Sequence, residues 1–155
     1  MTHIIRIFVF VYIVGFGSFL LKANPIVIEY PMVVEKSIEY CVINKICIDD
    51  NHTEIFFYYK NPSSKGWINF SRTTTLEILR SSESYELQYA KGIPLSPYKQ
   101  DLRFGEGVYF SLVFPSVLKE IKRGDFIRIK ENLQGGFLFS FRLYTNIKEY
   151  SRNAN

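Results

Sequence analysis

The chain reads Asp125-Phe-Ile-Arg-Ile-Lys130 and, after Gln134-Gly-Gly136, Phe137-Leu-Phe-Ser-Phe-Arg-Leu-Tyr144, which is its clearest β-hairpin pattern. The first run alternates apolar and polar side chains, as a strand does when it buries one face. The second run is rich in aromatic residues, which strands favour. The glycines between the two runs accept the positive φ angles of a tight turn. The stretch therefore predicts an antiparallel hairpin, and it favours an all-β fold.

The segment before this hairpin predicts a central strand followed by one short helix near 116–123. Val108-Tyr-Phe-Ser-Leu-Val-Phe114 is the most apolar run outside the N-terminus, and Pro115 ends it. Ser116 is a suitable helix cap, and Gly124 is a suitable stop. The two basic residues before that glycine suit the negative C-terminal end of a helix dipole.

The rest of the domain is also rich in strand-forming residues, with aromatic residues making up 17% of the chain. The sequence predicts about eight to ten short strands separated by turns, which is typical of an antiparallel β-sandwich or a partly open barrel. Residues 54–60 and 67–70 are expected to form a hairpin. Residues 91–107 hold several glycines and prolines and predict one long irregular segment, and long loops are often functional. The expected strands span 26–30, 32–36, 54–60, 67–70, 85–90, 108–114, 125–130 and 137–144, with 73–80 either a strand or a short helix.

The N-terminal stretch Met1–Ala23 has the pattern of a secretory signal peptide. Arg6 precedes 15 uncharged residues that end at Leu21, and the small residue Ala23 marks a plausible cleavage site. A permanent membrane helix needs about 20 residues. The alternative is an uncleaved anchor over residues 4–21. Both readings place residues 24–152 outside the cytoplasm as a single exported domain, periplasmic or secreted, with residues 153–155 as a disordered tail.

The charge of the exported part argues against nucleic acid as a partner. Residues 24–155 carry 17 basic and 15 acidic side chains, so the net charge is small. The charge is unevenly spread, because residues 24–90 are net acidic and residues 91–155 are net basic. The basic half is either a face for an acidic partner or an ordinary solvated surface. A membrane partner is expected only if the N-terminal segment stays uncleaved.

The two cysteines, Cys41 and Cys47, predict a disulfide. In a straight strand, residues six positions apart are separated by about 20 Å. A disulfide needs Cα atoms within about 7 Å of each other. Asn44-Lys45 offers a place for the chain to reverse, because asparagine tolerates the left-handed conformation of tight turns. We therefore expect a Cys41–Cys47 bridge that closes a small hairpin.

The sequence contains no motif that identifies an enzyme, a metal site or a cofactor site. The exported part has one histidine, His52, in a polar turn where a solvated side chain is the simplest interpretation. No Gly-x-Ser-x-Gly element accompanies it. Paired carboxylates remain as candidates for a hydrolase with a cleft near residues 91–107. These pairs are Glu83 with Glu86 and Asp101 with Glu106.

Aromatic side chains form the constellation that points most directly to function. Neighbouring residues on a strand face opposite ways, so Tyr58 and Tyr59 do not both enter one core. Outward Tyr and Trp side chains are frequent anchors in recognition. The leading hypothesis is a non-catalytic, protein-binding module, such as a toxin-neutralising or envelope-associated protein. A carboxylate-based hydrolase and a structural or adhesive subunit are the alternatives. The expected contact residues are Tyr58, Tyr59, Trp67, Tyr85, Tyr89 and Tyr98.

Overall fold

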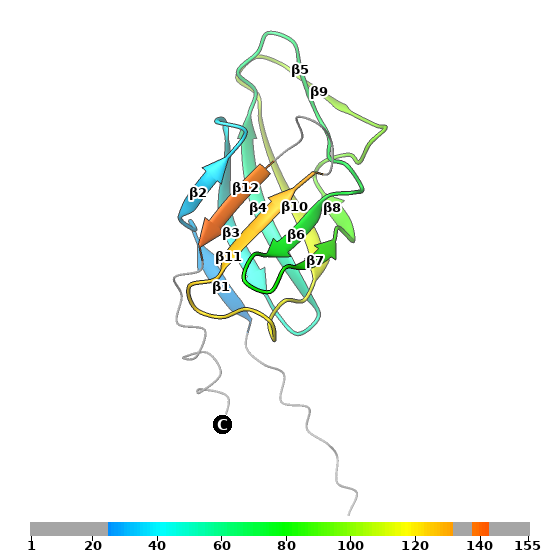
Figure 1. Cartoon of the computed structure of the whole chain (residues 1–155). Coiled ribbons are helices and arrows are strands. Elements are labelled where there is room, and N and C mark those ends of the chain that lie inside the picture. The colour runs from blue at the N-terminus through cyan, green and yellow to red at the C-terminus, as the bar shows by residue number, and fades with distance from the viewer. Residues whose placement is uncertain (1–24, 132–137, 143–155) are drawn as a thin grey trace, which may run out of the picture.

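The computed structural model of the chain describes residues 25–131 and 138–142 (Figure 1). This described part is all-β, with twelve strands in three antiparallel sheets and no helix. The strands are β1 (Ile26–Glu29), β2 (Val33–Lys36), β3 (Cys41–Ile48), β4 (His52–Lys60), β5 (Gly66–Ile68), β6 (Thr75–Ile78), β7 (Glu83–Glu86), β8 (Tyr89–Lys91), β9 (Gln100–Leu102), β10 (Gly107–Pro115), β11 (Phe126–Lys130) and β12 (Leu138–Arg142).

Two five-stranded sheets face each other and enclose the hydrophobic core (Figure 1). The first sheet has the order β1-β3-β4-β10-β8, and the second has the order β2-β12-β11-β6-β7. Phe57 of β4 stacks on Phe110 of β10 with ring centroids 5.0 Å apart, and it meets Phe139 of β12 edge-on at 5.8 Å. The second of these contacts joins the two layers, and burying each such ring contributes about 2 kcal/mol.

A third, two-stranded sheet of β5 and β9 lies at one end of the molecule, at the top of Figure 1. We call residues 61–69 and 98–106, which contain these strands and their flanking turns, the end ribbon. The end ribbon falls in two segments that the sequence predicts differently. Residues 61–69 cover the connection and most of the second strand of the hairpin expected from 54–60 and 67–70. Residues 98–106 lie in the expected irregular segment 91–107.

A bulge in β3 replaces the predicted turn at Asn44-Lys45. Ile43 pairs with Phe57 of β4 and Lys45 pairs with Phe56, so the intervening Asn44 has no opposite residue. One extra residue reverses the alternation of a strand, which is why positions 41 and 43 before the bulge and positions 46 and 48 after it are all buried. The bulge lets β3 keep one apolar face over its full eight residues.

The predicted Cys41–Cys47 disulfide is therefore wrong in this structure, where both thiols are free. Both cysteines belong to the continuous strand β3, and six residues of strand separate them by about 20 Å. They also face opposite ways. Cys41 is buried in the core, whereas Cys47 pairs with Glu54 on the outer face of the first sheet. The turn was predicted at positions 44–45 because a disulfide would require the chain to reverse there, and the structure has a bulge at that place instead.

The helix predicted over 116–123 is also wrong, because the chain forms only a single turn there. The Val117 carbonyl accepts a hydrogen bond from the Ile121 N–H at 3.0 Å. The next N–H, of Lys122, would have to donate to the following carbonyl to continue a helix. It donates instead to the Asp125 carboxylate at 2.8 Å. A side-chain acceptor thus competes with the helical bond and ends the turn.

Other strand predictions have mixed outcomes. The pairing of β11 with β12 confirms the antiparallel pairing predicted for 125–130 and 137–144, whose turn at 134–136 lies outside the described residues. Strand β10 is paired on both sides, as expected for a central strand. The hairpin predicted between 54–60 and 67–70 is wrong, because β4 pairs with β3 and β10 while β5 pairs with β9. The expected strand 85–90 is split between β7 and β8, which belong to different sheets.

The predicted signal peptide or anchor in 1–23 and the predicted tail 153–155 lie outside the described residues. Within 25–131 and 138–142, the chain has no helix whose length and hydropathy would suit a membrane span.

Candidate functional site

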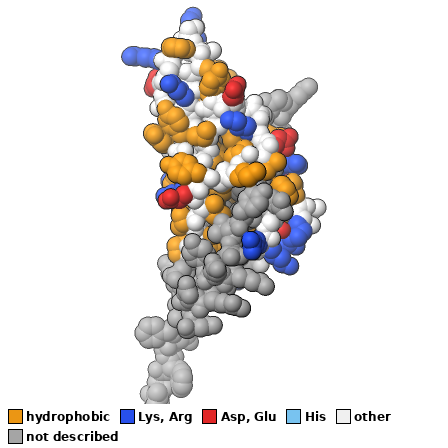
Figure 2. All heavy atoms as spheres, turned by 90° about the vertical axis from the view of Figure 1, so that its left-hand side faces the viewer, with side chains coloured by type: hydrophobic (Ala, Val, Ile, Leu, Met, Phe, Trp, Pro, Cys, Tyr) orange, Lys and Arg blue, Asp and Glu red, His pale blue; other side chains and the backbone are white. Residues whose placement is uncertain are grey.

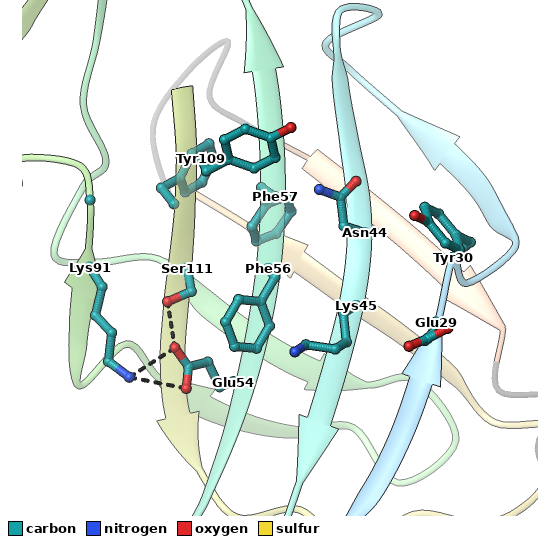
Figure 3. A pocket seen from close by; sticks show the side chains of 12 residues that line it. Glu29, Tyr30, Asn44, Lys45, Glu54, Phe56, Phe57, Lys91, Tyr109 and Ser111 are labelled. Carbon is teal, nitrogen blue, oxygen red and sulfur yellow. Dashed lines mark hydrogen bonds and ion pairs between the residues drawn. The ribbon is translucent and has the colours of Figure 1, made fainter. Parts of the chain in front are cut away.

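The outer face of the first sheet carries a groove of about 670 Å³ (Figure 3). All five strands of the sheet contribute to its lining, from Glu29 on β1 to Lys91 on β8. Successive strands lie about 4.8 Å apart, so the groove is about 19 Å long across the sheet. Ligand sites commonly have volumes of this order. The groove is therefore the leading candidate site in the described part of the chain.

A buried carboxylate, that of Glu54 on β4, lies at the β8 end of the groove. The residue is only 7% exposed. Its Oε1 atom accepts hydrogen bonds from the Ser111 hydroxyl at 2.6 Å and from Lys91 Nζ at 2.9 Å, and Oε2 accepts from the same ammonium at 3.0 Å. Figure 3 shows these contacts linking β8, β10 and β4. The ion pair thus ties the short edge strand β8 to the middle of the sheet.

These contacts keep Glu54 ionised. Burial by itself would raise the Glu54 pKa, but the hydrogen bonds from Ser111 and Lys91 outweigh it and lower the pKa below its ordinary value. The hydrogen bond to Glu54 correspondingly raises the pKa of Lys91. His52 adds a weaker contact, with Nε2 lying 3.8 Å from Glu54 Oε2. A carboxyl that stays charged in this way is poorly suited to act as a general acid.

Aromatic rings line the middle and the rims of the groove. Lys45 Nζ lies 4.4 Å from the centroid of the Phe56 ring, a cation–π contact between β3 and β4. Tyr109 of β10 lies against Tyr58 of β4 with ring centroids 4.7 Å apart, yet Tyr109 remains 72% exposed. Tyr30, just beyond β1, is 79% exposed at the opposite rim. The groove therefore has an exposed tyrosine ring at each of two rims, and charged, polar and aromatic side chains line the surface between them.

The six aromatic residues predicted as contacts do not form one surface. Tyr58 and Tyr89 lie on the outer face of the first sheet, where Lys91 Nζ is 5.8 Å from the Tyr89 ring. Trp67 and Tyr98 belong to the end ribbon, at 58% and 72% exposure. The other two, Tyr59 and Tyr85, pack against the hydrophobic core.

The predicted carboxylate pairs do not converge in a cleft. Asp101 has an 84% exposed side chain beside Lys99. Glu106 accepts a hydrogen bond from the Arg103 N–H within its own turn. Glu83 and Glu86 are exposed at the two ends of β7. Among the described residues, no three His, Cys, Asp or Glu side chains are grouped to hold a metal ion.

Two of the most exposed groove residues, Tyr109 and Tyr30, were missed by the sequence analysis. The signal for Tyr109 was present, because strand alternation in 108–114 places it opposite to the buried Phe110. Tyr30 carries no such signal. It has a positive φ of 47° in the turn that leads the chain from β1 to β2, and sequence patterns do not reveal such a conformation.

No model of a known protein family matches the chain, and no curated protein matches its sequence.

Proposed function

We propose that this chain is an exported, non-catalytic binding module that recognises another protein through the groove on the outer face of the first sheet. The observation that carries the proposal is the groove's span across all five strands, with Tyr109 and Tyr30 exposed at its rims. Export is proposed from the signal-like pattern of Met1–Ala23.

A protein partner fits the size and chemistry of this groove. A path of about 19 Å accommodates about six residues of extended chain, at roughly 3.3 Å per residue. Glu29 and Lys45 supply charges of both signs beside aromatic rings, a mixture that suits a peptide segment. Further apolar side chains are exposed beyond the Tyr30 rim, and Figure 2 shows hydrophobic side chains gathered on this side of the molecule. The exposed residues there include Met32, Val34 and Val42.

The hydrolase alternative has less support. Glu54 is the buried carboxylate of the groove, and its pairing with Lys91 lowers its pKa. Glu29 on β1 is separated from it by the intervening strand β3, which corresponds to about 10 Å between the two strands. A water-activating pair would need at least one carboxylate free of a cation and aimed at the other.

Site-specific photo-crosslinking tests the proposal. A photoreactive phenylalanine analogue is placed at Tyr109, and as a matched control at Leu79, which is 37% exposed and does not line the groove. In the source cells, we expect position 109 to give a discrete protein adduct and position 79 to give none. With the partner purified, Tyr109→Ala should weaken binding by about 30-fold, as loss of an interface anchor does. Absence of an adduct at 109, or equal adducts at both positions, would contradict the proposal.

A further inference from the structure

The end ribbon projects beyond the two large sheets and turns one face to solvent (Figure 1). Trp67 of β5 pairs with Asp101 of β9, so their side chains share this face. Lys99 lies on the same face, because its Nζ is 5.9 Å from the Trp67 ring centroid and 4.0 Å from Asp101 Oδ1. Lys65 and Arg103 are exposed and directly flank the two strands. The opposite face packs inward, as the 4% exposure of Leu102 indicates.

The end ribbon carries exposed aromatic rings and cations close together in the chain. Trp67, Tyr98 and Phe104 are 58%, 72% and 74% exposed. Lys99 Nζ lies 5.9 Å from the centroid of the Trp67 ring. Figure 2 shows basic and hydrophobic side chains side by side at this end of the molecule. An exposed surface this rich in large aromatic rings is typical of an interaction site and unusual for an ordinary solvent-exposed loop.

The positive charges outnumber the negative ones on this surface. The ribbon carries three exposed cations, Lys65, Lys99 and Arg103, and two carboxylates, of which Asp101 lies beside Lys99. Glu106, the other acidic residue of the ribbon, accepts a hydrogen bond from the Arg103 N–H at 2.8 Å within its turn. The net charge of the end ribbon is thus positive and open to an anionic surface.

The end ribbon is held rigidly by one buried amide, that of Asn61. This residue is 1% exposed, and its Nδ2 donates to the carbonyls of Ser63, Leu102 and Arg103 at 2.9 to 3.2 Å. The ribbon packs so closely on it that a Cβ added to Gly66 would lie 2.3 Å from its Oδ1. The aromatic rings are therefore presented by a fixed support, which lowers the entropy lost on docking.

We propose that the end ribbon docks on the surface of an anionic lipid bilayer. Trp and Tyr favour the water–lipid interface, and cations beside them are attracted to anionic headgroups. Phe104 distinguishes a bilayer from a soluble polyanion, because an uncovered apolar ring gains free energy on entering the headgroup region and gains little from a polyanion. The surface shares no residue with the groove proposed to bind a protein, so either proposal can fail alone.

Trp67 is the only tryptophan of the chain, so its fluorescence reports directly on the end ribbon. The full chain, or its processed form if the host removes residues 1–23, is mixed with vesicles of phosphatidylglycerol and phosphatidylcholine. We expect a blue shift of Trp67 emission and quenching by brominated lipid. Attachment through the N-terminal segment alone would bring protein to the vesicles without shifting this emission. That result, or no binding, would overturn the proposal.

Variants and probes sharpen the test. Reversing both charges in K99E/R103E should weaken partitioning at least tenfold, since each cation near an anionic surface contributes about 1 kcal/mol. Phe104→Ser should weaken it several-fold. Met32→Ser, which removes a 60% exposed apolar side chain elsewhere, should leave it unchanged. A Trp67 shift with soluble polyphosphate and none with vesicles would assign the surface to a polyanion and refute membrane docking.

Discussion

The groove and the end ribbon both combine aromatic rings with charges, but their carboxylates differ in burial and in pairing. In the groove, Glu54 is 7% exposed and is held by Ser111 and Lys91. In the end ribbon, Asp101 has an 84% exposed side chain whose nearest cation, on Lys99, is 4.0 Å away. A buried and bonded charge contributes to the stability of the fold, whereas an open one is available to a partner. The difference indicates which charges hold the molecule together and which face outward.

The largest expected effect comes from removing the buried charge. Glu54→Ala should lower the free energy of unfolding by about 3 kcal/mol, because hydrogen bonds to a charged group are lost and the buried Ser111 hydroxyl is left without an acceptor. Urea unfolding followed by circular dichroism measures this. The control is Glu77→Ala, which removes a less buried carboxylate, with a side chain 18% exposed against 9% for that of Glu54, from its ion pair with Lys130 on the second sheet and should cost less than about 1 kcal/mol. Equal losses in both variants would break the comparison.

The support of the end ribbon should give the next largest effect. Asn61→Ala removes the donor shared by three carbonyls and should destabilise by about 2 kcal/mol. Asn69→Ala is the matched control, because its amide makes one exposed hydrogen bond to the Tyr98 carbonyl and should cost about 0.5 kcal/mol. The same urea titration measures both variants. A loss for Asn61→Ala no greater than the control would mean that the ribbon does not depend on this amide.

Lowering the pH should remove a smaller part of the free energy of unfolding. The folded-state pKa of Glu54 lies below its ordinary value of 4.5, so its contribution is complete above that pH and is lost as the pH falls through the folded pKa. Glu54→Gln should therefore be about 1 kcal/mol less stable than the natural protein at pH 7, and the gap should shrink below pH 4.5. Unfolding free energies at pH 7 and pH 3 test this. A difference in unfolding free energy that stays constant or increases at pH 3 would contradict this prediction.

The smallest effect is expected at the exposed rings of the end ribbon. Trp67→Ala and Phe104→Ala should each change the free energy of unfolding by no more than about 0.5 kcal/mol, as exposed substitutions usually do. Circular dichroism is the suitable probe, because the first variant lacks tryptophan. A loss above about 1 kcal/mol would show that these rings belong to the fold, and it would weaken the contrast with Glu54.

Local alternation predicted the strands better than it predicted their partners. The runs 108–114 and 125–130 became β10 and β11, because a period of two in apolar residues fixes which face is buried. The pairing of β5 with β9 joins segments more than 30 residues apart in the chain, and no local pattern encodes such a pairing. For the same reason, the groove itself was not predictable, since its lining comes from five strands that are assembled only in the fold.

The wrong predictions arose where a local pattern has two physical solutions. An asparagine inside a strand-like segment is compatible with a tight turn or with a bulge, and at Asn44 the chain forms the bulge. Capping and dipole signals favoured a helix over 116–123, but the Asp125 carboxylate captured the Lys122 N–H. Tertiary contacts decided both cases, so the sequence around each site was insufficient.

The bulge at Asn44 also determines which disulfides the two cysteines can form under oxidation. It sets Cys41 and Cys47 on opposite sides of one sheet, so neither thiol can reach the other. Burial raises the pKa of Cys41 to about 12, which leaves almost no thiolate there to react. Cys47 is only partly buried, so it is the thiol that an outside disulfide can reach, and burial raises its pKa as well. Each molecule therefore has one accessible thiol. Oxidation can join two copies through a single disulfide between their Cys47 residues, and it cannot link further copies to that pair.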